Sequence, residues 1–115
     1  MFLLTETFIS FKVFLLIETW VIMINQELSE IYDIITKLNT VEDSQNFLNE
    51  LLTESELNDI VQRWNILKML SKNDSQRNIS KALSVSLCKI TRGAKILKNK
   101  NSLIRQILFD ESWRN

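Results

Sequence analysis

The sequence predicts an all-helical protein, and three observations lead to that prediction. The 115 residues include one glycine and no proline, so the residues that usually form turns are nearly absent. Leu, Ile, Lys, Asn and Glu dominate the composition. Apolar residues recur every three or four positions along most of the chain, which is the period of an amphipathic helix. We therefore expect one domain of six helices with short connections.

The composition also excludes several kinds of chemistry. The chain has no histidine and a single cysteine, Cys88. It therefore cannot form a His/Cys metal site, a Ser-His-Asp or Cys-His pair, or an internal disulfide. One glycine is too few for a phosphate-binding glycine-rich loop. We predict no enzyme, no catalytic residue, no metal and no cofactor, and nothing requires a compartment other than the cytoplasm.

The net charge of zero hides a strong segregation of charge along the chain. Residues 1–59 carry 11 acids and two bases, residues 60–105 carry 11 bases and one acid, and the last ten residues have a net charge of −1. A 46-residue block with a charge of +10 is typical of a surface that binds a polyanion, most often nucleic acid. The alternative is a solvated basic face that is attracted to the acidic face of the same protein or of the same dimer.

Residues 1–24 form a strongly apolar stretch that Glu6, Lys12 and Glu18 interrupt. Each charge would cost roughly 2.5–3.5 kcal/mol at the centre of a bilayer. A basic segment and a small-residue cleavage site, which a secretory signal requires, are not visible. We expect this stretch to lie outside the functional fold, with translation beginning at Met23 and the functional domain covering residues 25–115. An amphipathic, membrane-touching extension and a membrane anchor are the alternatives.

The acidic half predicts three helices. The first runs from Gln26 to Leu38, with the stripe Leu28, Ile31, Ile34, Ile35 and Leu38. The second runs from Val41 or Glu42 to Leu52, with Phe47, Leu48, Leu51 and Leu52 on its buried side. A capping box formed by Thr53 and Glu56 starts the third, which ends near Leu70. Its expected core stripe is Leu57, Ile60, Val61, Trp64, Leu67 and Leu70.

The basic half predicts a helix-turn-helix over residues 76–98. After a polar break, Asp74 or Ser75 caps a short helix from Gln76 to Leu83. A three-residue turn then leads into a helix from Leu87 to about Leu97. Val85 and Ile90 are expected to pack on Ala82 and Ile79. Asn101 or Ser102 caps a sixth helix, whose stripe is Leu103, Ile104, Ile107 and Leu108.

The lone glycine, Gly93, falls inside the second helix of this pair, directly after Arg92. A glycine within a helix costs roughly 1 kcal/mol relative to alanine. Its presence predicts that something passes close to the backbone at this point.

The start of the second helix of a helix-turn-helix enters the major groove of DNA. The expected groove contacts are Gln76, Arg77, Leu87, Cys88, Lys89 and Thr91, and Lys98 is expected among the phosphate contacts. Cys88 is interpreted as a small, nearly apolar residue beside the DNA, and Trp64 as a core residue.

The motifs Leu52-Thr53-Glu54-Ser55-Glu56, Ser75-Gln76-Arg77 and Ile90-Thr91-Arg92-Gly93 resemble the bacterial Trp repressor family over roughly residues 47–98. The resemblance implies an intertwined six-helix homodimer, with L-tryptophan bound between the long helix and the reading helix of different subunits. It implies that Arg63 and Arg92 flank the indole ring, that Arg92 pairs with the carboxylate, and that Gly93 leaves room for the ring. Thr53 and the carbonyls near Leu52 would meet the ammonium group.

Some positions depart from the family pattern. Ile96 stands where the family usually has a ligand-contacting serine, and Glu50 replaces an apolar residue. Ser84 takes the place of a turn glycine, and Ser80 that of a DNA-contacting lysine. These departures favour an altered ligand preference or a weaker affinity for tryptophan.

The function expected from the sequence is a DNA-binding repressor of tryptophan biosynthesis or transport genes, with L-tryptophan as corepressor and no membrane contact by the core domain. The alternative is a ligand-independent helical module that binds DNA or an acidic protein, tethered to a membrane through its N-terminus.

Overall fold

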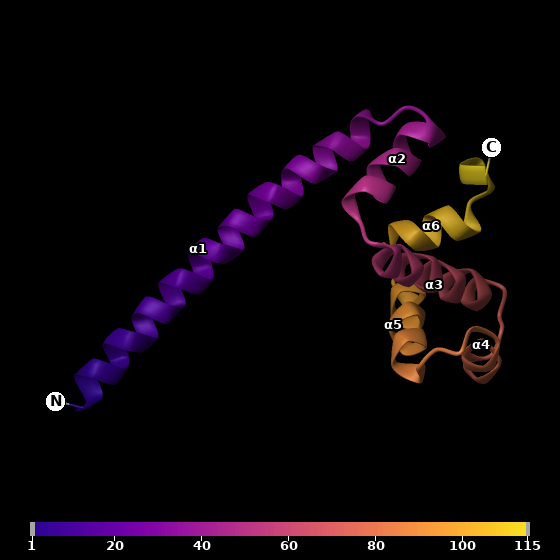
Figure 1. Cartoon of the computed structure of the whole chain (residues 1–115). Coiled ribbons are helices and arrows are strands. Elements are labelled where there is room, and N and C mark those ends of the chain that lie inside the picture. Colours follow the sequence, from indigo (N-terminus) through magenta and orange to yellow (C-terminus); the bar gives the residue numbers. More distant parts are fainter. Residues whose placement is uncertain (1, 115) are drawn as a thin grey trace. The chain divides into compact units, whose positions relative to one another are not determined.

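The computed structural model describes residues 2–114, with the side chains of residues 10–110, 112 and 113. The described residues form six α-helices and one short 3-10 helix, and they contain no strand (Figure 1). The prediction of an all-helical fold is therefore confirmed. Contacts within the chain divide it into two compact units, Met1–Phe47 and Leu48–Asn115.

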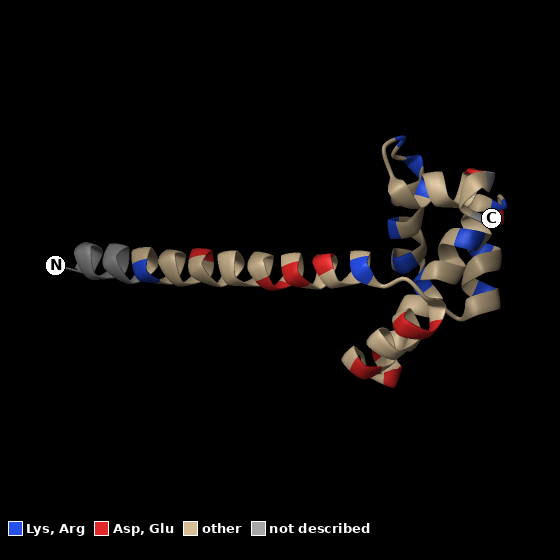
Figure 2. Cartoon of the chain, turned by 90° about the horizontal axis from the view of Figure 1, so that it is seen from above, with Lys and Arg blue, Asp and Glu red and all other residues tan. Residues whose placement is uncertain are grey.

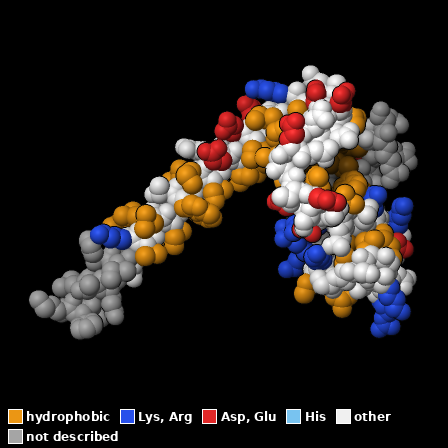
Figure 3. All heavy atoms as spheres, viewed as in Figure 1, with side chains coloured by type: hydrophobic (Ala, Val, Ile, Leu, Met, Phe, Trp, Pro, Cys, Tyr) orange, Lys and Arg blue, Asp and Glu red, His pale blue; other side chains and the backbone are white. Residues whose placement is uncertain are grey.

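The first unit is built on one long helix, α1, which spans Phe2–Lys37 without a break. It joins the predicted helix at residues 26–38 to the apolar stretch before it, so the expected boundary after residue 24 falls inside a continuous helix. Hydrophobic side chains are exposed along α1, among them Phe11, Leu16, Trp20 and Tyr32 (Figure 3). None of the helices in the described part of the chain is long and apolar enough to cross a membrane. The separate role expected for residues 1–24 stays a prediction.

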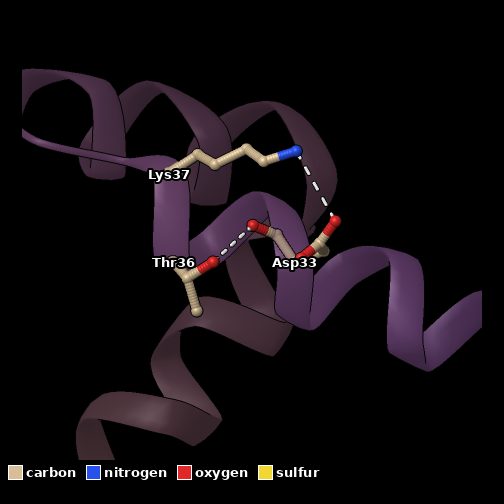
Figure 4. Close-up of polar contacts among 3 residues, drawn as sticks. All are labelled: Asp33, Thr36 and Lys37. Atoms are coloured by element: carbon tan, nitrogen blue, oxygen red, sulfur yellow. Dashed lines mark hydrogen bonds and ion pairs between the residues drawn. The ribbon is translucent and has the colours of Figure 1, made fainter.

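Local side-chain contacts mark the end of α1. The Lys37 ammonium lies 3.5 Å from a carboxylate oxygen of Asp33, and the Thr36 hydroxyl donates to the Asp33 carbonyl at 2.7 Å (Figure 4). Beyond the helix, the Thr40 hydroxyl accepts the backbone N–H of Asp43 at 3.0 Å. This contact satisfies one of the free N–H groups at the start of α2, which spans Val41–Leu51.

The second unit contains four further α-helices: α3 (Glu54–Ser71), α4 (Gln76–Leu83), α5 (Leu87–Lys98) and α6 (Leu103–Phe109), followed by the 3-10 helix η1 (Glu111–Arg114). Their starts follow the cap residues in the sequence. Thr53 and Glu56 form the predicted capping box, and Ser75 and Ser102 are the caps of α4 and α6. The turn between α4 and α5 contains Ser84 in the left-handed conformation, with φ 53° and ψ 46°.

Two adjoining apolar clusters hold the second unit together. Ile66, Ile79, Val85 and Ile90 form the first, which fixes α4 and α5 against α3. Leu67, Leu97 and Leu108 form the second, which packs α6 against α3 and α5. The predicted packing of Val85 and Ile90 on Ile79 is confirmed, whereas Ala82 is exposed and was wrongly placed in this contact.

The predicted core stripe of α3 is only partly correct for a single chain. Leu67 is buried, but Ile60, Val61 and Trp64 are 46%, 57% and 37% exposed. Ile66, which was not predicted, is 1% exposed and lies at the centre of the core. At about 100° per residue, Val61 and Trp64 lie some 140–160° around the helix from Ile66. The helix therefore has two apolar faces, and only the one with Ile66 packs on α4 and α5.

The predicted buried side of α2 is also largely open in the single chain. Leu48 and Leu51 are 37% and 52% exposed, while Phe47 and Leu52 are half-buried. The apolar stripe is present, and two of its residues stay exposed among the described residues.

Candidate functional site

The residues of α5 fall on three faces of the helix at about 100° per residue. The core face carries Ile90 and Leu97, which are 0% and 9% exposed. A second face carries Lys89, Arg92 and Ile96, and the third, outer face carries Leu87, Thr91 and Lys98. The four residues Lys89, Arg92, Thr91 and Lys98 are all exposed, so their position around the helix decides what each of them can contact.

The second face of α5 borders a pocket of about 420 Å³ between α3, α5 and α6. Its lining combines cations from α3 and α5 with an apolar floor: Arg63, Ile66, Leu67, Cys88, Lys89, Arg92, Gly93, Ile96 and Ile104. Four of the six residues predicted to bind the ligand therefore come together here: Arg63, Arg92, Gly93 and Ile96.

Leu52 and Thr53, the other two predicted ligand residues, do not line this pocket. Thr53 caps α3 ten residues before Arg63, which corresponds to about 15 Å along a helix. Its hydroxyl accepts the backbone N–H of Glu56 at 3.2 Å and donates to the Glu56 carboxylate at 2.9 Å. The single chain therefore does not bring Leu52 and Thr53 to this pocket, and their contact with a ligand stays a prediction.

The same contacts affect the acidity of Glu56. The backbone N–H of Thr53, and secondly its hydroxyl, stabilise the carboxylate and lower the pKa of Glu56 below its ordinary value of 4.5. The start of α3 is thus held by a charged capping box.

The chemistry of the pocket lining favours an anionic ligand with an apolar body. Arg63, Lys89 and Arg92 supply three positive charges, and none of the lining residues is acidic. The floor is formed by aliphatic side chains, including Ile66 and Ile104. A pocket of this volume accepts a small molecule. Guanidinium groups both stack on aromatic faces and pair with carboxylates, so an aromatic carboxylate fits this arrangement.

Gly93 explains how α5 approaches α3 so closely. Its φ is not positive, so backbone conformation does not require a glycine. A Cβ at this position would lie 3.1 Å from Leu70 Cδ1, 3.2 Å from Ile66 Cγ2 and 3.6 Å from Leu67 Cδ2. The close approach predicted from the sequence comes, within one chain, from side chains of α3. Gly93 also lines the pocket, and its predicted contact with a ligand stays a prediction.

Cys88 and Lys89, which the sequence placed among the DNA contacts, also line the pocket. The Lys89 ammonium donates to the Gln62 side-chain oxygen on α3 at 2.8 Å. The remaining pocket residues that were not predicted, Ile66, Leu67 and Ile104, come from three-dimensional packing. The position of Lys89 at the pocket could have been predicted from the sequence, because Lys89 lies within about 60° of Arg92 on the helical wheel.

The outer face of α5 continues onto α4. Arg77, Ser80, Lys81 and Leu87 line a depression of about 460 Å³ between the two helices. Gln76, Arg77, Leu87, Thr91 and Lys98 are all exposed. The Thr91 hydroxyl donates to the Leu87 carbonyl at 2.8 Å, and the Ser80 hydroxyl donates to the Val85 carbonyl at 2.9 Å. Ser80 thus stabilises the turn, and the lysines and arginines of these helices supply the positive charge (Figure 2).

The fold and the pocket define a small all-helical protein in which consecutive short helices, α4 and α5, carry a basic surface beside a ligand-sized pocket. Residues 26–112 match the family model of the Trp repressor protein. The chain belongs to this family, which is a regulatory DNA-binding family and not an enzymatic one.

Proteins of Xylella fastidiosa described as "Trp operon repressor homolog" support the assignment. The one from strain 9a5c is 39% identical over 69 residues, which cover 59% of this chain and 75% of that protein. Those from strains M23 and Temecula1 are 38% identical over the same length, with the same shares covered. No solved structure matches the chain.

Proposed function

We propose that this protein is a cytoplasmic transcriptional repressor that binds operator DNA as a homodimer with L-tryptophan as its corepressor, and that it controls tryptophan biosynthesis or transport genes. The observation that carries the proposal is the pocket in which Arg63, Arg92, Gly93 and Ile96 meet, directly behind the outer face of α5. The family and the name of the Xylella relatives support the choice of ligand.

In the proposed complex, the indole ring lies on the aliphatic floor of the pocket between the guanidinium groups of Arg63 and Arg92 of the same chain, not between the long helix and the reading helix of different subunits as the resemblance implied. Arg92 pairs with the carboxylate, since a charge-assisted hydrogen bond is the strongest contact the pocket offers. The carbonyl of Leu52 and the cap at Thr53 meet the ammonium group from the second subunit. Ile96 adds an apolar contact where the family usually has a serine.

The homodimer supplies what the single chain lacks. Ile60, Val61 and Trp64 form an apolar face on α3 that stays 46%, 57% and 37% exposed, and Leu51 of α2 is 52% exposed. Residues of this kind are abundant in the cores of obligate interfaces. An intertwined dimer would bury them and would bring the second subunit's Leu52 and Thr53 within reach of the pocket.

The proposed DNA-binding surface is the outer face of α5 together with the start of α4. Leu87 and Thr91 face the edges of bases in the major groove, Gln76 and Arg77 add contacts from α4, and Lys98 binds phosphate. The two reading helices of the dimer would enter successive major grooves about 34 Å apart. Ligand binding and DNA binding would then be linked reciprocally.

The test begins with selection of binding sites from random-sequence duplexes in the presence of L-tryptophan. The affinity for the selected palindrome is then measured by fluorescence anisotropy with and without L-tryptophan. We expect L-tryptophan to tighten binding at least tenfold and Arg92→Ala to abolish this response.

The matched control is Lys95→Ala, which removes a charge from the same helix outside the pocket and should keep the response to L-tryptophan. Equal operator affinity of the wild-type protein with and without L-tryptophan would contradict the proposal and favour a ligand-independent module.

A further inference from the structure

We infer that Lys89 is a second cation for the carboxylate of the ligand, that Gln62 holds it in place, and that it does not contact DNA. This inference rests on the proposed function, because it concerns the same pocket. It assigns to the pocket a residue that the sequence had placed on the DNA surface.

The position of Lys89 around α5 separates it from the DNA surface. At about 100° per residue, Lys89 lies about 160° from both Leu87 and Thr91 and on the opposite side from Lys98. A helix that places Leu87 and Thr91 in a groove therefore turns Lys89 away from it. From Arg92 and Ile96 it is separated by only about 60° and 20°, so these three side chains share one face.

The contacts of Lys89 place its ammonium group at the pocket. Lys89 lines the pocket, and its Nζ donates to Gln62 Oε1 across the gap between α5 and α3 at 2.8 Å. Gln62 is half-buried and lies one turn before Ile66, which forms part of the pocket floor. An ammonium group has three N–H donors, so two remain for a ligand while the first is held by Gln62.

The charges of the pocket determine what the remaining donors can bind. Lys89 and Arg92 are three residues apart on α5, so they are neighbours along the pocket edge. No carboxylate belongs to the lining, and the acceptor that Lys89 has is a neutral amide oxygen. A ligand carboxylate beside Arg92 therefore meets a second positive charge. Gln62 acts as a positioning residue, since it reaches the ligand only through Lys89.

The test uses Lys89→Met, which keeps most of the aliphatic stem and removes the charge, with Lys98→Met as the matched control on the outer face. Isothermal titration calorimetry on the full chain measures the affinity for three probes: L-tryptophan, indole-3-propionate, which lacks the ammonium group, and tryptamine, which lacks the carboxylate. The salt dependence of duplex binding is measured for the same variants.

We expect Lys89→Met to lower the affinity for L-tryptophan and for indole-3-propionate about tenfold. The affinity for tryptamine should change less than twofold, and the salt dependence of duplex binding should stay unchanged. Lys98→Met should leave all three probes within twofold and reduce the slope of log K against log salt by about 0.9 for each phosphate that the variant no longer neutralises. Gln62→Leu should lower the affinity for the two probes that carry a carboxylate about threefold in the wild-type background. In the Lys89→Met background it should have no further effect on these affinities.

Two results would overturn the inference while the proposed function stood: unchanged carboxylate affinity in Lys89→Met, or a reduction of the salt dependence in that variant equal to the reduction in Lys98→Met. If the wild-type protein bound none of the three probes, both the inference and the proposed function would fail.

Discussion

Gly93→Ala is the substitution for which the structure gives an expectation opposite to that of helix propensity alone. Propensity favours alanine over glycine by about 1 kcal/mol within a helix. The structure opposes this gain, because the new Cβ would lie 3.1 Å from Leu70 Cδ1 and 3.2 Å from Ile66 Cγ2. Carbon atoms pack best at about 3.5–4.0 Å, so both neighbours must move by a few tenths of an ångström.

The two neighbours differ in their freedom to move. Leu70 is half-buried and can adjust the end of its side chain. Ile66 is 1% exposed, and its β-branched side chain has essentially one χ1 rotamer available in a helix. Overpacking of a core typically costs about 1–3 kcal/mol. This packing cost exceeds the gain in helix propensity, so we expect Gly93→Ala to destabilise the fold by about 1 kcal/mol.

The assay is urea unfolding at a fixed chain concentration, because the proposed dimer would make the apparent stability depend on concentration. Lys95 is exposed on the same helix, so Lys95→Ala and Lys95→Gly together measure the propensity difference without any packing cost. We expect Ala to be more stable than Gly at position 95 and less stable at position 93. If alanine stabilised the protein equally at both positions, the close contact of α5 with α3 would not be what requires the glycine.

Three further predictions concern local features of the structure. Thr53→Ala should lower the free energy of unfolding by about 1 kcal/mol at pH 7. Because the folded-state pKa of Glu56 is lowered, chiefly by the Thr53 backbone N–H and secondly by the Thr53 hydroxyl, its contribution is present above pH 4.5 and is lost as the pH falls through the lower folded pKa; the difference between wild type and variant should therefore narrow in acid by the share of the hydroxyl, while the loss of the cap to the Glu56 N–H remains. Ser84→Gly should stabilise the fold by about 0.5–1 kcal/mol in thermal unfolding, since φ at this residue is 53° and left-handed geometry is costly for a residue with a Cβ; a drop in stability would contradict this reasoning. Ile60→Glu should leave helicity by circular dichroism unchanged and shift sedimentation from dimer to monomer, whereas a dimer that survived would exclude this face of α3 from the interface.

The starts of α3, α4 and α6 were predictable because polar caps determine them locally, whereas the start of α1 was not predicted. Thr53, Ser75 and Ser102 each accept a backbone N–H at the start of a helix, and this requirement is visible in a few consecutive residues. The packing of Val85 and Ile90 on Ile79 was predictable for a similar reason, since a short turn joins two short helices.

The core of α3 was not predictable in the same way. Ile66 lies on one apolar face of the helix, while Ile60, Val61 and Trp64 lie on another. Periodicity identifies both stripes but does not say which of them meets α4 and α5 and which stays exposed in the single chain. That decision depends on the helix crossing, which the contact of Gly93 with α3 helps to fix.

For the site, the sequence motifs supplied four of the pocket residues, whereas the grouping of Leu87, Cys88, Lys89 and Thr91 as one DNA-contacting surface stays a prediction. Leu87, Cys88, Lys89 and Thr91 were grouped as DNA contacts because they follow one another at the start of a helix. Successive helical residues point about 100° apart, so such a group spans more than half of the circumference. The helical wheel of α5 separates Leu87 and Thr91 from Lys89 without any further information.

The three faces of α5 also suggest how the two proposed sites communicate. The helix has 12 residues, about 18 Å in length, and it is anchored by Ile90 and Leu97 in the core. A ligand between α3 and α5 that contacts Arg92 and Ile96 lies about 100–140° around the helix from Thr91, so any shift of the helix away from α3 moves the outer face by a similar amount. No chain of intervening residues is needed, because both sites share one rigid element. The coupling then depends on how far α5 can move against Ile66 and Leu70, and this is why a single methyl group at Gly93 should change both stability and the response to ligand.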